Sequence, residues 1–275
     1  MCLGFIDSVF FKNDQLVEIN TIVNSEKTSN KAIYEVFRVI GGKPLFIYGH
    51  LERLKNSLNK SEIQFSSSEP EQLKKRIKKL CEVNHKDFGN IELRISVDEQ
   101  GNINKYLGFI KHSYPDATAY IHGIATKTLN VVRKNPAVKA KNTNARKLSN
   151  DFISENNLYE VLLVNNRGEL TEGSRSNLFL IKGNMVYTAP NTMVLEGITR
   201  MKVLQALNNL EIELVSDPIN LSEISEFQSA FICGTSPGVL PINRINRVEF
   251  DVLNKILREI ILEYNNIVND YLSGN

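Results

Sequence analysis

The chain has 275 residues, 42% of them hydrophobic, which is enough for one large domain or two modest domains with real cores. Its 33 basic and 31 acidic side chains leave a net charge of +2, which gives no reason to expect a nucleic-acid partner, and no apolar run is long enough to span a membrane. Three scattered cysteines and four histidines show neither a disulfide framework nor metal-ligand spacing. We therefore expect no metal and a reducing, cytoplasmic environment.

The first part of the chain shows the patterns of strands and helices in turn. Residues 1–15 predict a first strand. Two apolar segments around Gly41-Gly42 predict a hairpin, and leucines at helical spacing predict the helix that follows. The elements expected next are strands at 32–40 and 43–48, helices at 50–60 and 66–84, and strands at 90–98 and 104–112.

A change in composition at residues 113–120 marks a domain linker. We place the linker at 116–121, between a small domain at 1–115 and a larger domain at 122–275. The elements expected beyond it are strands at 123–132, 159–165, 176–189 and 229–237, and helices after 147, at 195–210 and at 250–272. These elements predict an α+β fold of two domains with active-site loops between them.

Five segments follow one another in a characteristic order. They read YEVFRVIGGKPLFIYGHLERL, VKAKN, YEVLLVNNRGELTEGSRSNLFLIKGNMVYTAP, LEGITR and FICGTSPGVLPI, and they extend from Tyr34 to Ile242. In this order they resemble the class IV (fold type IV) enzymes that depend on pyridoxal 5′-phosphate (PLP). That family contains branched-chain aminotransferases, D-amino acid aminotransferases and aminodeoxychorismate lyases. The resemblance implies a small N-terminal α/β domain and a larger C-terminal PLP-binding domain with a β-barrel-like sheet.

A PLP enzyme needs a lysine whose amine condenses with the cofactor aldehyde and later moves protons as a base. Lys139 is the candidate, and the resemblance implies that it holds PLP as a Schiff base. Family members carry an asparagine three residues later, here Asn142, and a glutamate thirty-odd residues later, here Glu172 (172 − 139 = 33). Lys141 is a rival whose spacing fits less well. Without the flanking motifs, a solvated basic stretch would be the preferred interpretation.

The resemblance also assigns the other cofactor contacts. Glu172 would hold the pyridine nitrogen, because a carboxylate keeps the ring protonated and able to accept electrons. Arg53 would bind the phosphate, since a guanidinium fork suits its oxygens, and the helix start in LEGIT would add N–H groups. A surface arginine and simple helix capping are the alternatives. The expected cofactor-binding residues are Arg53, Lys139, Glu172, Ser176, Asn177, Leu195, Gly197, Ile198, Thr199, Thr235 and Ser236.

For substrate binding, the resemblance points to Tyr34 and Arg94, with strand packing and a solvent-facing arginine as the alternatives. Two positions depart from the family pattern. Branched-chain enzymes have a tyrosine five residues after the lysine, where this chain has Asn144, and D-amino acid and lyase members lack that tyrosine as well. Arg175 stands where relatives often carry glycine or serine, and we expect it to narrow the pocket or bind an acid group of the substrate.

The resemblance predicts a PLP-dependent aminotransferase of amino acid metabolism. It would move an amino group between an amino acid, branched-chain-like or of D configuration, and a 2-oxo acid, as a homodimer. One alternative is a 4-amino-4-deoxychorismate lyase that releases pyruvate and 4-aminobenzoate, and another is a non-catalytic PLP-binding module. The sequence leaves open which amino acid is used, its L or D configuration, and the choice between transaminase and lyase.

Overall fold

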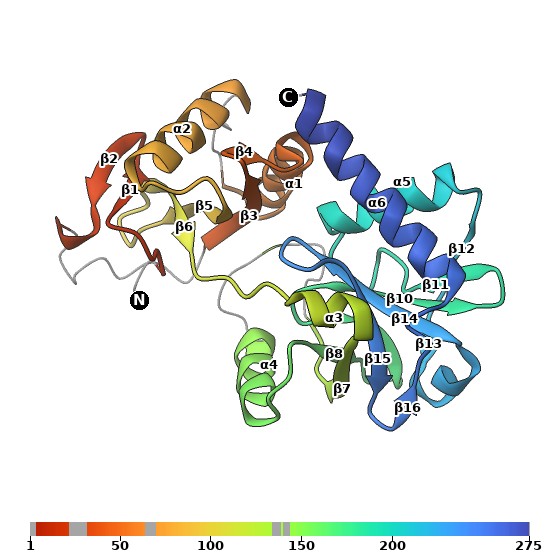
Figure 1. Cartoon of the computed structure of the whole chain (residues 1–275). Coiled ribbons are helices and arrows are strands. Elements are labelled where there is room, and N and C mark those ends of the chain that lie inside the picture. Colours follow the sequence, from red (N-terminus) through yellow and green to blue (C-terminus); the bar gives the residue numbers. More distant parts are fainter. Residues whose placement is uncertain (1–3, 22–31, 64–69, 134–138, 140–143, 275) are drawn as a thin grey trace. The chain divides into compact units, whose positions relative to one another are not determined.

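The computed structural model describes residues 4–21, 32–63, 70–133, 139 and 144–274. The chain divides into two compact units (Figure 1). The first consists of Met1–Ser113, Val138–Asn142 and Tyr271–Asn275, and the second of Tyr114–Ala137 and Thr143–Asp270. The first unit therefore combines segments that are distant in sequence. The linker placed at 116–121 stays a prediction.

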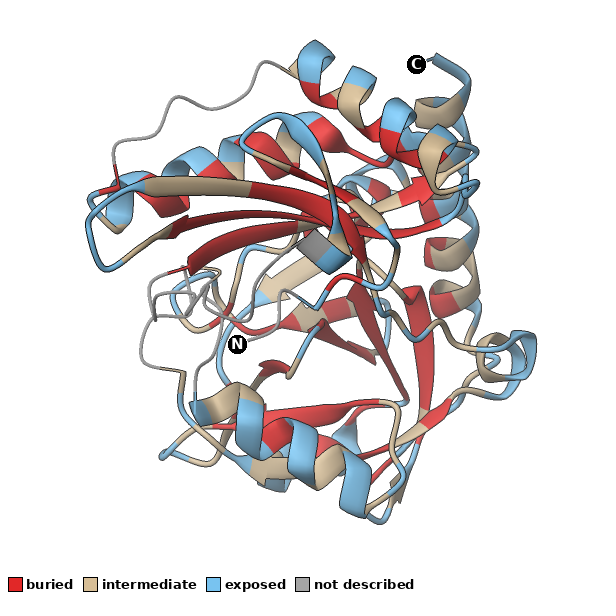
Figure 2. Cartoon of the chain, turned by 90° about the vertical axis from the view of Figure 1, so that its left-hand side faces the viewer, coloured by how far each residue is buried: buried red, intermediate tan, exposed pale blue. Residues whose placement is uncertain are grey.

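The first unit is built on a six-stranded antiparallel sheet with the order β2-β1-β6-β5-β3-β4. β3 and β5 pair over nearly their whole length, from Ala32↔Ser96 to Val39↔Gly89. Helices α1 (Ile47–Lys60) and α2 (Pro70–Val83) pack on one face of this sheet through their buried apolar sides (Figure 2). The strands are β1 (Val9–Lys12), β2 (Gln15–Glu18), β3 (Ala32–Ile40), β4 (Lys43–Pro44), β5 (Gly89–Val97) and β6 (Ile103–Ile110), and the 3-10 segment η1 (Ile19–Thr21) follows β2.

The start of α1 differs from the sequence prediction. The strand expected at 43–48 is wrong beyond Pro44, because only Lys43–Pro44 pairs with β3. Pro44 has no N–H to donate to a strand ladder, and Phe46 adopts a left-handed conformation with φ of 54°, so the chain turns into α1 at Ile47.

The second unit is built on a closed barrel of six strands. The ring runs β10-β14-β15-β7-β8-β9 and returns to β10. It closes through one short pairing, Asn177 of β10 opposite Glu172 of β9. This barrel confirms the predicted α+β fold with a barrel-like sheet. The strands are β7 (Ile124–Asn130), β8 (Val161–Val164), β9 (Glu169–Gly173), β10 (Asn177–Lys182), β11 (Met185–Thr188), β12 (Glu213–Ser216), β13 (Ile219–Asn220), β14 (Ser229–Gly234), β15 (Gly238–Ile245) and β16 (Val248–Glu249).

Helices surround the barrel. They are α3 (Ala117–His122), α4 (Asn144–Glu155), α5 (Ile198–Asn209) and α6 (Lys255–Gly274), with the 3-10 segment η2 (Leu221–Glu226). α5 packs on β14 and α3 on β15. The sequence analysis missed α3 because its six residues are too short to show helical periodicity, although Asp116 caps it by accepting a hydrogen bond from the N–H of Ala119 at 2.8 Å.

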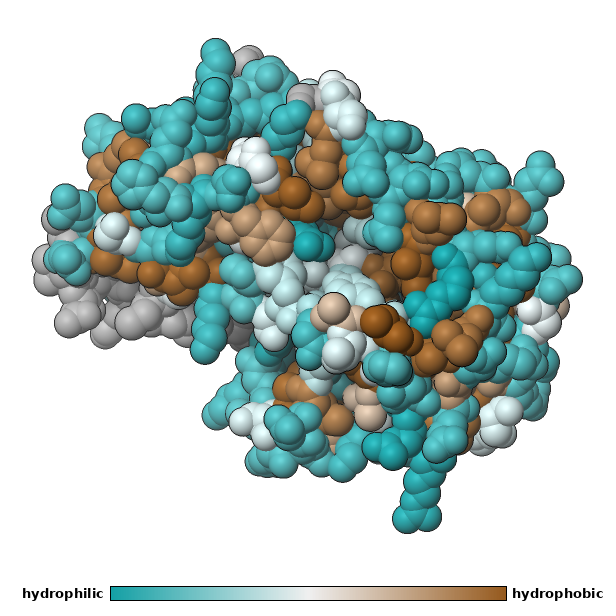
Figure 3. Space-filling model, viewed as in Figure 1, coloured by the Kyte–Doolittle hydropathy of each residue, from teal (hydrophilic) through white to brown (hydrophobic). Residues whose placement is uncertain are grey.

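Polar side chains cover most of the face seen in Figure 3, with smaller apolar areas between them. Among the residues that the structure describes, Leu253 and Leu262 are the most exposed large hydrophobic side chains, at 72% and 63%. Among the helices that the structure describes, none combines the length and hydrophobicity that crossing a bilayer requires.

Two aromatic rings anchor the barrel wall beneath α5. Phe179 of β10 lies directly opposite Phe231 of β14, and their rings stack at a centroid distance of 5.0 Å and an angle of 3°. Both side chains are fully buried. They therefore contribute through buried apolar area and through packing between neighbouring strands.

We expect Phe231→Ala to lower the free energy of unfolding by about 3–5 kcal/mol, because it leaves a cavity beside Phe179 in the fully buried packing of β10 and β14. Denaturant titration followed by circular dichroism measures the loss. Leu253→Ala removes an exposed side chain and is the matched control, with an expected change within about 0.5 kcal/mol. Equal stability of the two variants would contradict this description of the core.

Candidate active site

A buried carboxylate lies at the centre of a polar cluster in the first unit. Strand alternation places Glu35 of β3 between Ile33 and Phe37, on the face that α1 covers, with no exposed surface. Arg53 of α1 donates to it through Nε at 2.8 Å and through Nη2 at 2.6 Å. His50, three residues earlier on α1, places its Nδ1 2.7 Å from the Oε2 of Glu35. This bidentate pairing fixes the orientation of Arg53, the predicted phosphate ligand.

The charges of this cluster depend on one another. Burial by itself raises the pKa of Glu35, but the charges of Arg53 and Lys139, with hydrogen bonds from Arg53 and His50, outweigh it and hold that pKa well below its usual range. Burial lowers the pKa of His50 to about 4, against the opposing effect of Glu35. His50 is therefore neutral at pH 7, and it donates its Nδ1–H to a carboxylate that can only accept.

Lys139, the predicted covalent lysine, belongs to the same cluster. Its Nζ lies 3.8 Å from the Oε2 of Glu35 and 5.5 Å from the centroid of the Tyr34 ring. Its carbonyl oxygen accepts a hydrogen bond of 3.5 Å from the N–H of Tyr34 on β3. The first unit thus brings together three residues that the sequence predicted for the site, namely Tyr34, Arg53 and Lys139.

Arg94 occupies β5 directly opposite Tyr34. Its side chain is buried, at 2% exposure, so the alternative of a solvent-facing arginine is wrong. Its Nε lies 2.7 Å and its Nη2 2.5 Å from the Oε1 of Glu92, two residues earlier on the strand. The carboxylate balances the buried charge. A substrate-binding role for Arg94 stays a prediction.

In the second unit, the buried carboxylate is Glu172, at the closure of the barrel. Its Oε2 accepts from the N–H of Leu195 at 3.0 Å and from the Nδ2 of Asn177 at 3.4 Å, and its Oε1 accepts from Arg133 at 2.5 Å. Asn177 also donates to the carbonyl oxygen of Leu195 at 2.8 Å. Burial raises the pKa of Glu172, while Arg133 and the N–H of Leu195 act in the opposite direction. Three predicted cofactor residues therefore form one network.

A second buried carboxylate, Glu160, shapes the turn that joins β9 to β10. It accepts from the N–H groups of Ser174 and Arg175, both at 3.1 Å, and from the hydroxyls of Ser174 at 2.6 Å and Ser176 at 2.9 Å. Gly173 is required in this turn, because a Cβ there would lie 2.0 Å from the Oγ of Ser176. The TEGSRSN motif is thus a tightly bonded turn that holds the predicted residue Ser176 in place.

The LEGIT motif forms the start of α5. Gly197 is its N-cap, and a Cβ on this residue would lie 2.3 Å from the Oδ1 of Asn177. Ile198 and Thr199 follow in the first helical turn and are buried. No side-chain hydrogen bond caps this helix end within the described residues. The N–H groups of such an end, together with the helix dipole, favour an anion.

The GTSP motif lies beside the turn between β9 and β10. A Cβ on Gly234 would lie 3.3 Å from the carbonyl oxygen of Arg175. Thr235 and Ser236 follow this glycine and are half-buried. The side chain of Arg175 is exposed, and its Nη2 donates to the Oδ1 of Asn150 on α4 at 2.5 Å.

Several residues of these networks were not predicted from the sequence, among them Glu35, Glu92, Arg133 and Glu160. Glu35 carried a signal, because it is an acidic residue in the apolar phase of a predicted strand. Arg133 and Glu160 carried none, since their partners become neighbours only through the folding of the barrel. Lys141 and Asn142 lie outside the described residues.

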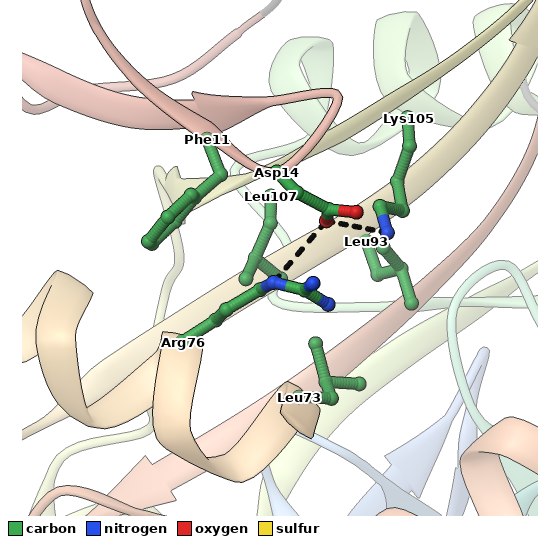
Figure 4. A pocket seen from close by; sticks show the side chains of 7 residues that line it. All are labelled: Phe11, Asp14, Leu73, Arg76, Leu93, Lys105 and Leu107. Atoms are coloured by element: carbon green, nitrogen blue, oxygen red, sulfur yellow. Dashed lines mark ion pairs between the residues drawn. The ribbon is translucent and has the colours of Figure 1, made fainter. Parts of the chain in front are cut away.

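A shallow hollow also occurs between α2 and the sheet of the first unit (Figure 4). Its charged groups pair with one another, because the Oδ1 of Asp14 lies 3.2 Å from Arg76 and 2.5 Å from Lys105. None of the predicted site residues lines it, and we assign no ligand to it.

Comparison with known proteins decides the family, since a profile described as amino-transferase class IV matches residues 32–245. The chain belongs to the class IV aminotransferases. These are enzymes that depend on PLP. The chain is 28% identical to a D-alanine aminotransferase of Bacillus licheniformis, with 78% of both chains covered. It is 30% identical to a "Probable branched-chain-amino-acid aminotransferase" of Thermotoga maritima, covering 82% of this chain and 81% of that one.

Other relatives extend the range of chemistry within the family. An aminodeoxychorismate lyase of Bacillus subtilis is 23% identical, over 79% of this chain and 78% of its own. The branched-chain amino acid aminotransferase of Escherichia coli has the same fold, with a TM-score of 0.84, 18% identity and coverage of 96% and 95%. The T.th. branched-chain amino acid aminotransferase, solved with pyridoxamine 5′-phosphate, also has the same fold, with a TM-score of 0.84, 19% identity and coverage of 97% and 96%.

The residues of this class IV chain fit PLP. Glu172 is a buried carboxylate suited to a protonated ring nitrogen, and the uncapped start of α5 offers N–H groups to a phosphate. The side chain of Lys139 keeps 15% exposure, so it is not sealed in the core. Arg53 supplies a guanidinium that Glu35 already orients.

The neutral state of His50 makes stability depend on pH. Its pKa is about 4 in the folded chain and 6.5 in the unfolded chain, so only the unfolded chain gains a proton as the pH falls below 6.5. Stability due to His50 is therefore complete above pH 6.5 and is lost progressively towards pH 4. We expect wild type to lose about 2 kcal/mol more than His50→Asn between pH 7 and pH 5.

Asparagine keeps an N–H donor for Glu35 but does not titrate, and the other histidines are the same in both proteins. Urea titrations of the two proteins at a series of pH values measure the difference. Parallel curves of stability against pH would show that His50 is not held neutral.

Proposed function

We propose that this chain is an aminotransferase that moves an amino group between an amino acid and a 2-oxo acid, with PLP attached at Lys139. The observation that carries the proposal is the Glu172 network. In it, Asn177 and Leu195 connect a buried carboxylate to the segment that begins α5. One set of hydrogen bonds thus connects Glu172, the proposed partner of the ring nitrogen, to the N-terminal end of α5, which attracts phosphate. When bound, PLP supplies an electron-withdrawing ring that stabilises negative charge at the α-carbon of the substrate.

The residues of the two networks have separate parts in this proposal. Glu172 holds the proton on the ring nitrogen, because an ionised carboxylate favours a protonated neighbour. Arg53 and the N–H groups at the start of α5 bind the phosphate. The amine of Lys139, once released by the substrate, is the base that moves the α-proton.

We infer a substrate that is a branched-chain or a D-amino acid. The names of the relatives support both classes at similar identity, 30% and 28%. Tyr34, Arg94 and Arg175 are the proposed substrate contacts. The ring of Tyr34 lies beside the amine of Lys139, where it would form a wall next to the reacting carbon, and the exposed Arg175 is accessible to an acid group.

A 4-amino-4-deoxychorismate lyase is the second candidate. The relative from Bacillus subtilis favours it, as does Asn144 at the position where branched-chain enzymes carry a tyrosine. The same lysine would serve either reaction. Release of pyruvate from the chorismate substrate, with no amino group transferred, distinguishes the two.

We also infer a cytoplasmic homodimer that acts on small molecules. This inference rests on analogy with the family.

We expect the purified chain with PLP to show a visible absorption band that one class of amino acid removes in the absence of a 2-oxo acid. The panel consists of L-branched-chain amino acids, L-glutamate, D-alanine and D-glutamate. Loss of the band with one of them identifies an amino-group donor and its configuration. A band that persists with every amino acid, together with pyruvate release from aminodeoxychorismate, would replace the transaminase with the lyase.

Lys139→Ala is expected to lack both the band and the activity, because it has no amine to hold the cofactor. Lys60→Ala removes an exposed lysine at the end of α1 and is the matched control that keeps both. Equal activity of Lys139→Ala and wild type would refute the proposed function.

A further inference from the structure

Glu35 is not among the residues proposed to touch cofactor or substrate, yet it orients Arg53 and faces Lys139, two groups that are. Its carboxylate bonds to Arg53 and faces Lys139, and it has no exposed surface. A buried carboxylate is costly unless it is paired, and apolar residues flank this position on the same strand face. The presence of an acid here therefore calls for an explanation beyond packing.

The two carboxylate oxygens of Glu35 are used differently. Oε1 accepts from the Nε of Arg53. Oε2 accepts from the Nη2 of Arg53 at 2.6 Å, lies 2.7 Å from the Nδ1 of His50, and is 3.8 Å from the Nζ of Lys139. One oxygen thus lies between the guanidinium of α1 and the amine of a segment more than eighty residues further along the chain.

The charges explain what this oxygen does. Within the described residues, the titratable or charged side chains that act on Glu35 are His50 and Arg53 from α1, and Lys139. With His50 neutral and Lys139 protonated, the cluster carries two positive charges and one negative charge. Without the carboxylate, two cations would face each other in a buried place, where their repulsion is weakly screened.

We propose that Glu35 is a positioning residue that holds the guanidinium of Arg53 and the amine of Lys139 side by side. The phosphate-binding group and the covalent attachment point are then kept at a set spacing. The inference rests on the proposed function, because it takes Arg53 as the phosphate ligand and Lys139 as the attachment point. Glu160 differs in kind, since hydroxyls and backbone N–H groups bind it, and it shapes a turn.

The test is Glu35→Gln in the full chain, with two measurements. The first is the apparent pKa of Lys139 in the cofactor-free protein, from competitive acetylation at a series of pH values and mass spectrometry of its peptide. We expect it to fall by about one unit, because an adjacent anion is lost while Arg53 remains. The second is the ratio of the dissociation constants of pyridoxal and PLP. This ratio measures how strongly the protein prefers PLP, and we expect it to fall about tenfold because Arg53 loses its orientation.

Two further variants separate positioning from general loosening. Leu54→Ala creates a cavity in the same α1–β3 packing and keeps the carboxylate, so the apparent pKa of Lys139 should stay within about 0.3 unit of wild type and the preference for PLP within about twofold. Glu35→Asp keeps the negative charge on a side chain that is one methylene shorter. Its apparent pKa for Lys139 and its preference for PLP should lie between those of wild type and Glu35→Gln. If Glu35→Gln does not fold, Glu35→Asp carries the test, and an unchanged apparent pKa of Lys139 in it overturns the proposal.

The outcomes for this inference and for the proposed function are distinct. If wild type attaches PLP at Lys139 and Glu35→Gln matches it in both measurements, the positioning role is wrong and the proposed function stands. If Leu54→Ala has the same effect as Glu35→Gln, the role of Glu35 is structural only. If wild type attaches no PLP at Lys139, the proposed function fails, and the acetylation experiment still reports whether Glu35 sets the state of this amine.

Discussion

The pairing of Glu172 with Asn177 is the contact on which the second unit depends. It joins β9 to β10 and so closes a six-stranded ring. Closure leaves the carboxylate of Glu172 with 2% exposure, which disfavours its charged form. Arg133 and the N–H of Leu195 offset part of this loss of water. The contacts that complete the barrel therefore also assemble the acid that the proposed chemistry requires.

Three buried carboxylates organise the polar networks of the two units, Glu35 in the first and Glu160 and Glu172 in the second, and their partners distinguish them. Glu160 is bound by hydroxyls and backbone N–H groups, which hold a turn in shape. Glu172 has one cationic partner and two amide donors, which act against the rise in its pKa that burial causes. Glu35 lies among cations and a neutral histidine, and its effect is on the groups around it. The three glutamate side chains thus have different roles because their hydrogen-bond and charge partners differ.

The sequence was most informative where local geometry restricts the residue type. Gly173 and Gly197 belong to turns in which a Cβ would collide with a neighbouring side chain, so TEGSRSN and LEGIT can be recognised as motifs without knowledge of the fold. Membership of the family and the barrel-like sheet followed from these segments. The assignment of individual residues to cofactor and substrate stays a prediction.

Other features depend on contacts between distant parts of the chain and could not be predicted. The pairing of Glu172 with Arg133 exists only once the barrel has closed, and Glu35 meets Lys139 only in the folded first unit. The early start of α1 depends on the left-handed conformation of Phe46, which cannot be predicted from hydrophobic periodicity or from residue type. The burial of Arg94 depends on Glu92, whose role is visible only when the sheet is covered.

The central claim is that PLP is attached at Lys139. Borohydride reduction of the PLP-loaded full chain, followed by proteolysis and mass spectrometry of every lysine-containing peptide, tests it most directly. We expect a phosphopyridoxyl group on the peptide that contains Lys139, at the side chain of that residue. Attachment at Lys134 or Lys141 instead, or at no lysine, would contradict it.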